Sequence, residues 1–346
     1  MRRYMKSVVG NDALCERLCR DVLSNKLSHA YIIEGADGTG KHLIAYQTAA
    51  ALACTRKSVQ DGNIPCGECP ECRKILGGKS PDVIVVNSDG KATIGVDTVR
   101  FIREDCITLP NDLDFKLYII EDADKMTDQA QNALLLTLEE PPSFVRFMLL
   151  CENATSLLET VRSRAPILRT MGVPQDELDK YICEKDPRAA QMKLSSPAEY
   201  AELIAASKNG IGRALEFLDA RAFAPTLEVR RLAYKFIETA TSGAKREELF
   251  SLLPVLAPKK TQRDLFARQL ETIALAASDL TLLKKDDRAP LTFFSDRAYA
   301  LEICERCSIN FLYDLTNAVL NAQESNSRSA NVRLTVIKMF ADANLI

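Results

Sequence analysis

The sequence predicts an α/β domain with a mostly parallel sheet, followed by a small and then a larger helical domain. Short runs rich in Val and Ile alternate with helix-like segments over about the first 170 residues. From about residue 174 those runs disappear, and helical spacing continues to the end of the chain. Strands that alternate with helices need crossover connections, which place the strands parallel in one sheet.

The individual elements follow from short apolar runs and from helical spacing. Strands are predicted at residues 30–34, 82–87, 116–121 and 147–151. Helices are predicted between them at residues 42–53, 96–106 and 127–140. The last helix is expected to end before Pro141, because the residue before a proline disfavours helical backbone. In the helical remainder, breaks are predicted at Pro254, Pro258 and Pro290.

The composition limits the class of protein. The chain has 346 residues and a net charge of −2, whereas a free-standing nucleic-acid binder usually has a clear basic excess. No apolar run approaches the roughly 20 residues that span a bilayer, and no apolar stretch of a secretory signal follows the basic N-terminus. We therefore expect a cytoplasmic protein without membrane contact, in which the eleven cysteines are reduced thiols or metal ligands.

A phosphate-binding loop is predicted between the first strand and the next helix. Backbone N–H groups of such a loop surround phosphate oxygens, and its lysine reaches the outer phosphates. His42 stands where a hydroxyl residue normally helps to hold Mg²⁺, and Asp37 adds a negative charge to a loop that binds anions. The sequence therefore leaves binding of ATP and Mg²⁺ open. The candidate nucleotide-binding residues here are Gly35, Gly38, Thr39, Gly40, Lys41 and His42.

An acidic pair follows the third strand, at Glu121 and Asp122. Hydrolases with this kind of loop use acidic residues at such a strand end to hold Mg²⁺ and polarise water. They usually show Asp before Glu, and the order here is reversed. Because a misplacement of about 1 Å can cost on the order of 10²-fold in rate, we expect a degenerate catalytic pair. The residues also suit an acidic helix N-terminus.

Four cysteines form a candidate metal site at Cys54, Cys66, Cys69 and Cys72. Each C-x-x-C step can present two thiolates to one ion, and four thiolates satisfy tetrahedral Zn²⁺. The surrounding insert, residues 54–80, has no core-forming pattern and is expected to need a metal for order. An iron–sulfur cluster is the alternative, but the further cysteine followed by proline that ferredoxin-type motifs carry is absent.

These motifs together resemble the clamp-loader subunits of bacterial DNA polymerase III, in the AAA+ class. The resemblance covers nearly all of residues 7–220 in motif order, and it includes residues 29–35, the cysteine insert and residues 132–142. It implies an AAA+ domain with the insert, a helical lid and an all-α collar that joins subunits. These three domains are expected at residues 1–172, 173–222 and 223–346.

The resemblance also implies roles for two arginines. Arg164 lies in Ser163-Arg164-Ala165, which is similar to a Ser-Arg-Cys motif whose arginine acts as a finger on the ATP of a neighbouring subunit. Arg213 lies in a segment similar to the sensor-2 region, which faces the nucleotide. After the fourth strand, the motor subunits carry Thr where this chain has Cys151 and Glu152.

The expected function is that of a loader subunit with little or no ATPase activity of its own, which presents Arg164 to a neighbour. The implied partners are motor subunits of the gamma/tau type, a delta subunit, the sliding clamp and, through the complex, primed DNA. An ATP-hydrolysing motor subunit of the same loader and an unrelated zinc-containing AAA+ adaptor are the alternatives.

Overall fold

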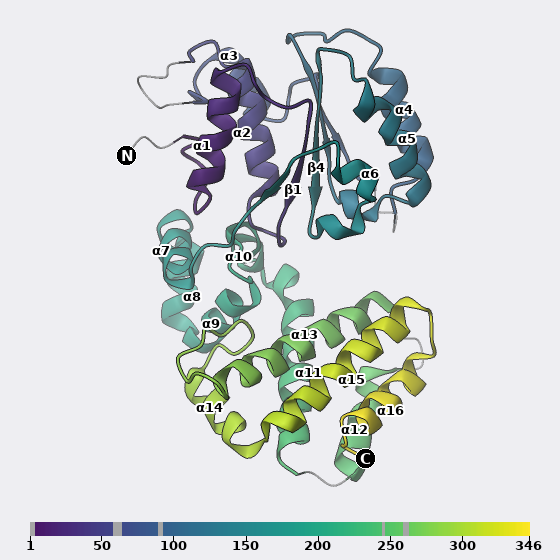
Figure 1. The fold of residues 1–346 in the computed structure, drawn as a ribbon. Helices are drawn as coiled ribbons and strands as arrows, with labels where there is room; N and C mark the ends of the chain where they lie inside the picture. Colours follow the sequence, from purple (N-terminus) through teal and green to yellow (C-terminus); the bar gives the residue numbers. More distant parts are fainter. Residues whose placement is uncertain (1–3, 58–63, 89–92, 244–245, 259–262) are drawn as a thin grey trace. The chain divides into compact units, whose positions relative to one another are not determined.

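The computed structural model describes residues 4–57, 64–88, 93–243, 246–258 and 263–346 (Figure 1). It divides into two compact units. The first comprises Met1–Pro174 and Asn209–Arg213, and the second comprises Gln175–Lys208 and Ala214–Ile346. The basic N-terminal residues 1–3 and residues 58–63 of the predicted cysteine insert lie outside the described residues. The division into three domains stays a prediction.

The first unit contains a parallel five-stranded sheet in the order β2-β3-β4-β1-β5. Its strands are β1 (Ala30–Glu34), β2 (Val83–Val86), β3 (Lys116–Ile120), β4 (Val145–Cys151) and β5 (Ile167–Arg169). Thus the predicted α/β fold with a parallel sheet is confirmed. The sequence did not predict β5, because three residues with only one buried side chain give no recognisable apolar run.

Helices cover both faces of this sheet (Figure 1). One face packs against α1 (Asp12–Leu23), α2 (Lys41–Ala53) and α3 (Pro70–Leu76). The other packs against α4 (Val96–Asp105), α5 (Asp128–Glu139) and α6 (Glu159–Arg162), with the short 3₁₀ turns η1 (Ala123–Lys125) and η2 (Ala154–Ser156). Seven of the 13 residues of α2 are buried, and five of these are Ala or Ile, so the helix packs closely against the sheet.

The second unit is helical. Its helices are α7 (Gln175–Lys185), α8 (Pro187–Ser195), α9 (Pro197–Ala206), α10 (Ile211–Phe217, shared with the first unit), α11 (Ala220–Thr241), α12 (Arg246–Leu256), α13 (Arg263–Leu283), α14 (Arg297–Arg306), α15 (Ile309–Ser327) and α16 (Val332–Asp342). The predicted break at Pro254 is wrong, because α12 continues through that residue and buries Leu252, Leu253 and Leu256. Across the described part of the chain, no helix is both long and apolar enough to cross a membrane.

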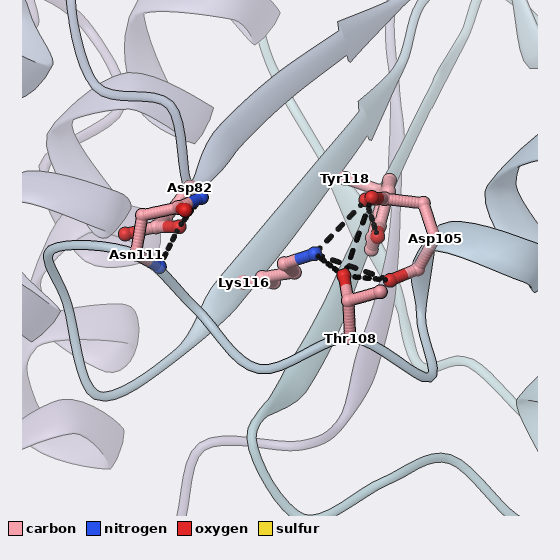
Figure 2. A network of polar contacts seen from close by, with 6 residues as sticks. All are labelled: Asp82, Asp105, Thr108, Asn111, Lys116 and Tyr118. Atoms are coloured by element: carbon pink, nitrogen blue, oxygen red, sulfur yellow. Dashed lines mark hydrogen bonds and ion pairs between the residues drawn. The ribbon is translucent and has the colours of Figure 1, made fainter.

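Two buried polar groups fix the loop between α4 and β3 (Figure 2). Asp82 is fully buried. Its carboxylate accepts hydrogen bonds from the backbone N–H groups of Asn111 at 2.7 Å, Asp112 at 2.7 Å and Leu113 at 2.9 Å. Nearby, the buried Nζ of Lys116 donates to Asp105 at 3.1 Å. Asp82 and Lys116 lie where β2 and β3 begin, so this network supports the end of the sheet opposite to the glycine-rich loop that follows β1.

Replacement of Asp82 by Asn is expected to lower the free energy of unfolding by about 3 kcal/mol. In the unsubstituted protein, backbone N–H groups donate to both carboxylate oxygens, whereas the amide of Asn would turn its own NH₂ donor toward one set of these N–H groups. Burial acts to raise the pKa of Asp82, but the hydrogen bonds from backbone N–H groups outweigh burial and hold the pKa of this carboxyl below its usual value. The carboxylate therefore stabilises the fold above the unfolded pKa of about 4, and this contribution is lost as the pH falls through the folded value. Urea unfolding at pH 7 and at pH 3 measures both effects. The exposed Asp114→Asn serves as the control, and an equal loss in both variants would contradict the assignment.

Candidate functional site

The predicted phosphate-binding loop lies between β1, which ends at Glu34, and α2, which begins at Lys41. Gly38 and Gly40 adopt φ values of +77° and +91°, in the left-handed region that favours glycine. A Cβ on Gly38 would lie 2.7 Å from the backbone nitrogen of Arg213. Both glycines are therefore needed for this loop shape, and Gly38 also for its close packing.

The polar groups of the loop bind one another. The Nζ of Lys41 donates to the carbonyl oxygens of Gly35 at 2.6 Å and Ala36 at 3.0 Å. The N–H of Gly38 donates to the carboxylate of Asp37 at 3.0 Å. A phosphate would have to displace that carboxylate and draw Lys41 away from the loop carbonyls.

Two distant segments close the same loop. The hydroxyl of Thr39 lies 2.7 Å from that of Thr170, which follows β5. The N–H of Gly212 donates to the carbonyl of Gly38 at 3.1 Å, and a guanidinium nitrogen of Arg213 lies 3.7 Å from Asp37. Arg213 therefore lies beside the loop. Sequence reasoning did not single out Thr170, since no local pattern links residues 131 positions apart.

His42 and Glu121 are in direct contact. The Nε2 of His42 lies 3.1 Å from the carboxylate of Glu121, which directly follows β3. Burial raises the pKa of Glu121, and the neighbouring Asp122 adds to this effect, while His42 opposes it. The carboxylate of Asp122 pairs instead with Lys125 at 2.9 Å. His42, which replaces the loop hydroxyl, and Glu121, from the reversed acidic pair, therefore interact directly with each other.

Cys151 and Glu152 differ in their surroundings at the end of β4. The thiol of Cys151 is buried, and burial raises its pKa to about 12. Glu152 is exposed, and its backbone N–H donates to Asp124 at 3.4 Å. A neutral buried thiol offers Mg²⁺-bound water a poor hydrogen-bond partner compared with a hydroxyl.

Arg164 follows α6 and is held by groups of α5 and α6. One guanidinium nitrogen donates to the carbonyl of Thr160 at 2.8 Å and to the hydroxyl of Ser163 at 3.3 Å. The other donates to the carboxylate of Glu139, the last residue of α5. The structure thus brings His42 to Glu121 and Arg213 to Asp37 beside the loop, whereas the contacts of Arg164 are with Thr160, Ser163 and Glu139.

The four cysteines converge on one point. The Sγ atoms of Cys54, Cys66, Cys69 and Cys72 all lie within 4.8 Å of one another, and those of Cys66 and Cys72 are 3.9 Å apart. A tetrahedral ion with metal–sulfur bonds of about 2.3 Å places its sulfurs about 3.8 Å apart. The donor set and its spacing therefore fit a structural metal ion that prefers thiolate ligands.

Backbone N–H groups point at the cysteine sulfurs. The N–H groups of Glu68 and Cys69 donate to the Sγ of Cys66 at 3.4 Å and 3.3 Å, and that of Cys72 donates to Cys69 at 3.4 Å. Although burial acts to raise the pKa of Cys66, these donors lower it to about 7. The local backbone thus stabilises a thiolate, the form that binds metal. All eleven cysteines of the chain are free thiols.

The fold and these sites define a parallel α/β domain with a glycine-rich loop after its first strand and a cluster of four cysteines. Residues 10–173 match the family described as DNA polymerase III, delta subunit. Over this stretch, which is just under half of the chain, the protein is similar to that family of DNA polymerase III subunits.

Individual relatives cover different shares of the chain. DNA polymerase III subunit delta′ of Bacillus subtilis is 32% identical over 207 residues, which are 59% of this chain and 60% of that protein. Subunit tau of the same organism is 36% identical over 159 residues, or 46% of this chain and 27% of that protein. A DNA polymerase III gamma subunit-related protein from Thermotoga maritima superposes with a TM-score of 0.47 at 20% identity, covering 95% of this chain and 97% of that one. The match to delta′ thus spans about three fifths of that relative.

Proposed function

We propose that this chain is a delta-prime-type subunit of a bacterial clamp loader, with little or no ATPase activity of its own. It presents Arg164 to the ATP of an adjacent motor subunit and so helps to load the sliding clamp onto primed DNA. The family match of residues 10–173 supports a role in DNA polymerase III. Within that role, the contact between His42 and Glu121 carries the proposal.

That contact disfavours hydrolysis by this chain. Mg²⁺ in such sites needs oxygen ligands from the loop hydroxyl and from the acidic strand end. Here an imidazole replaces the hydroxyl and engages Glu121 at 3.1 Å. The loop lysine and the N–H of Gly38 are also bound within the loop. Phosphate binding would require these contacts to break. The site would then still lack the usual oxygen ligands for Mg²⁺.

The other assignments fit a subunit of an assembled ring. The helices of residues 223–346 would form the collar that joins motor subunits of the gamma/tau type and a delta subunit, and the four cysteines would hold Zn²⁺ to order the insert. When bound, Zn²⁺ supplies only structural cross-linking of the four thiolates. The cytoplasmic location stays a prediction.

A motor subunit of the gamma/tau type is the second candidate. The similarity to subunit tau over 159 residues favours it, as does the presence of Lys41 in the loop. It requires a site that holds Mg²⁺ with His42 and Glu121 in their present positions, and for this reason we place it second.

The purified chain is expected to hydrolyse ATP at no more than about one-hundredth of the rate of a purified tau subunit, since both Mg²⁺ ligand positions are altered. Phosphate release under saturating ATP and Mg²⁺ measures this rate. Lys41→Ala is the control for contaminating activity, because any true turnover by this chain must disappear in that variant. Turnover equal to that of tau, and abolished by Lys41→Ala, would favour the motor subunit.

A further inference from the structure

Glu139 and Arg164 form an ion pair between two helical elements. Glu139 is the last residue of α5, and Arg164 follows the C-terminal end of α6. The side chains are 44% and 33% exposed, respectively, so the pair lies at the surface of the first unit. Solvent and incoming groups therefore reach both side chains.

The two terminal nitrogens of Arg164 have different partners. Nη1 binds within its own turn, to the carbonyl of Thr160 and the hydroxyl of Ser163. Nη2 binds across to Glu139. The contacts of Nη1 can orient the guanidinium without Glu139, whereas the Nη2 edge is occupied by a carboxylate. An incoming phosphate oxygen would compete with that carboxylate for the same donors.

The position of Glu139 is set by a rigid element. Helix α5 is anchored through buried Leu134 and Leu138, and it ends directly before Glu140 and Pro141. The carboxylate is therefore presented from a fixed helix end. It offsets the charge of Arg164 and would repel a triphosphate that approached it.

We propose that Glu139 is a positioning residue that holds Arg164 back from the ATP of the adjacent subunit until the two subunits close on each other. This inference rests on the proposed function of Arg164. Exposed ion pairs are weak, so the charge of a γ-phosphate can replace Glu139 once it is close. The contact thus limits hydrolysis in the open assembly without blocking it in the closed one.

The test compares Glu139→Gln with Glu140→Gln, an exposed neighbouring glutamate, in the complex reconstituted with motor and delta subunits. ATP turnover is measured without clamp and DNA. Glu139→Gln is expected to raise kcat by about two- to fivefold, the factor that an exposed ion pair contributes, with KM unchanged. Glu140→Gln is expected to behave as the unsubstituted protein. A purely structural role for Glu139 predicts a loss of turnover instead.

The double substitution separates this inference from the proposed function. In an Arg164→Ala background, Glu139→Gln is expected to have no effect, because the group that it releases is absent. If Arg164→Ala alone leaves turnover unchanged, the proposed function of Arg164 fails. If Arg164→Ala lowers turnover but Glu139→Gln does not raise it above Glu140→Gln, only the role of Glu139 is overturned.

Discussion

Replacing Arg164 by Ala is expected to lower ATP turnover at the adjacent motor site by about 10³-fold or more, while the subunits still assemble. An arginine finger stabilises the charge that develops on the transferred phosphate and contributes about 10³ to 10⁵ in rate. Arg164 is suited to this role because its Nη1 contacts fix its orientation while the side chain remains one-third exposed. Clamp-stimulated phosphate release by the reconstituted complex measures the loss.

Two further variants sharpen that measurement. Arg20→Ala removes an arginine from another exposed ion pair, with Glu16 on α1, and should leave turnover unchanged. Arg164→Lys keeps the charge but loses the planar fork, so it should recover only a small part of the rate. Unchanged turnover in Arg164→Ala, with assembly confirmed by gel filtration, would remove Arg164 from the reaction.

Replacing Cys72 by Ser is expected to abolish metal binding and unfold the cysteine insert. The purified chain should contain about one zinc per molecule, and Cys72→Ser less than about one-tenth of that. The sulfur of Cys72 lies within 4.8 Å of the other three cysteine sulfurs, and metal binding to such sites supplies about 10–16 kcal/mol in small zinc domains. Elemental analysis gives the metal content, and limited proteolysis at residues 54–80 reports the loss of order.

Cys183→Ser is the matched control, because Cys183 lies outside the cluster and contacts Tyr200 in the second unit. It should keep its full metal content. Iron in place of zinc would support the iron–sulfur alternative, and an unsubstituted chain without metal would overturn the metal site altogether.

Local pattern predicted most of the first unit. Apolar runs and helical spacing located β1 to β4 and the helices α2, α4 and α5, since each gives a signal over several residues, whereas α3 inside the cysteine insert was not predicted. The spacing of the cysteines predicted a cluster that the structure brings together. By contrast, β5 is too short to give a signal, and Pro254 fits into α12 because that helix packs through buried leucines.

The interactions that decide the chemistry were harder to predict. His42 and Glu121 were each recognised as departures, but their contact depends on the order of strands in the sheet. The pairing of Thr39 with Thr170 depends on the unpredicted β5, and that of Arg164 with Glu139 on how α5 and α6 pack. Such pairs are set by tertiary structure and leave no periodic trace in the sequence.

Helix α2 connects the glycine-rich loop to the cysteine cluster. Lys41 begins it at the phosphate-binding loop, and Cys54, a candidate metal ligand, caps its C-terminal end. Its 13 residues form a rod about 20 Å long, with a largely buried surface. A metal bound by Cys54 would hold the C-terminal end of α2 and would thereby limit movement of the loop at its N-terminal end along the helix axis. With a metal bound, the cysteine cluster would anchor this end of α2, and loss of the metal is expected to loosen the loop at the other end without any direct contact between the two.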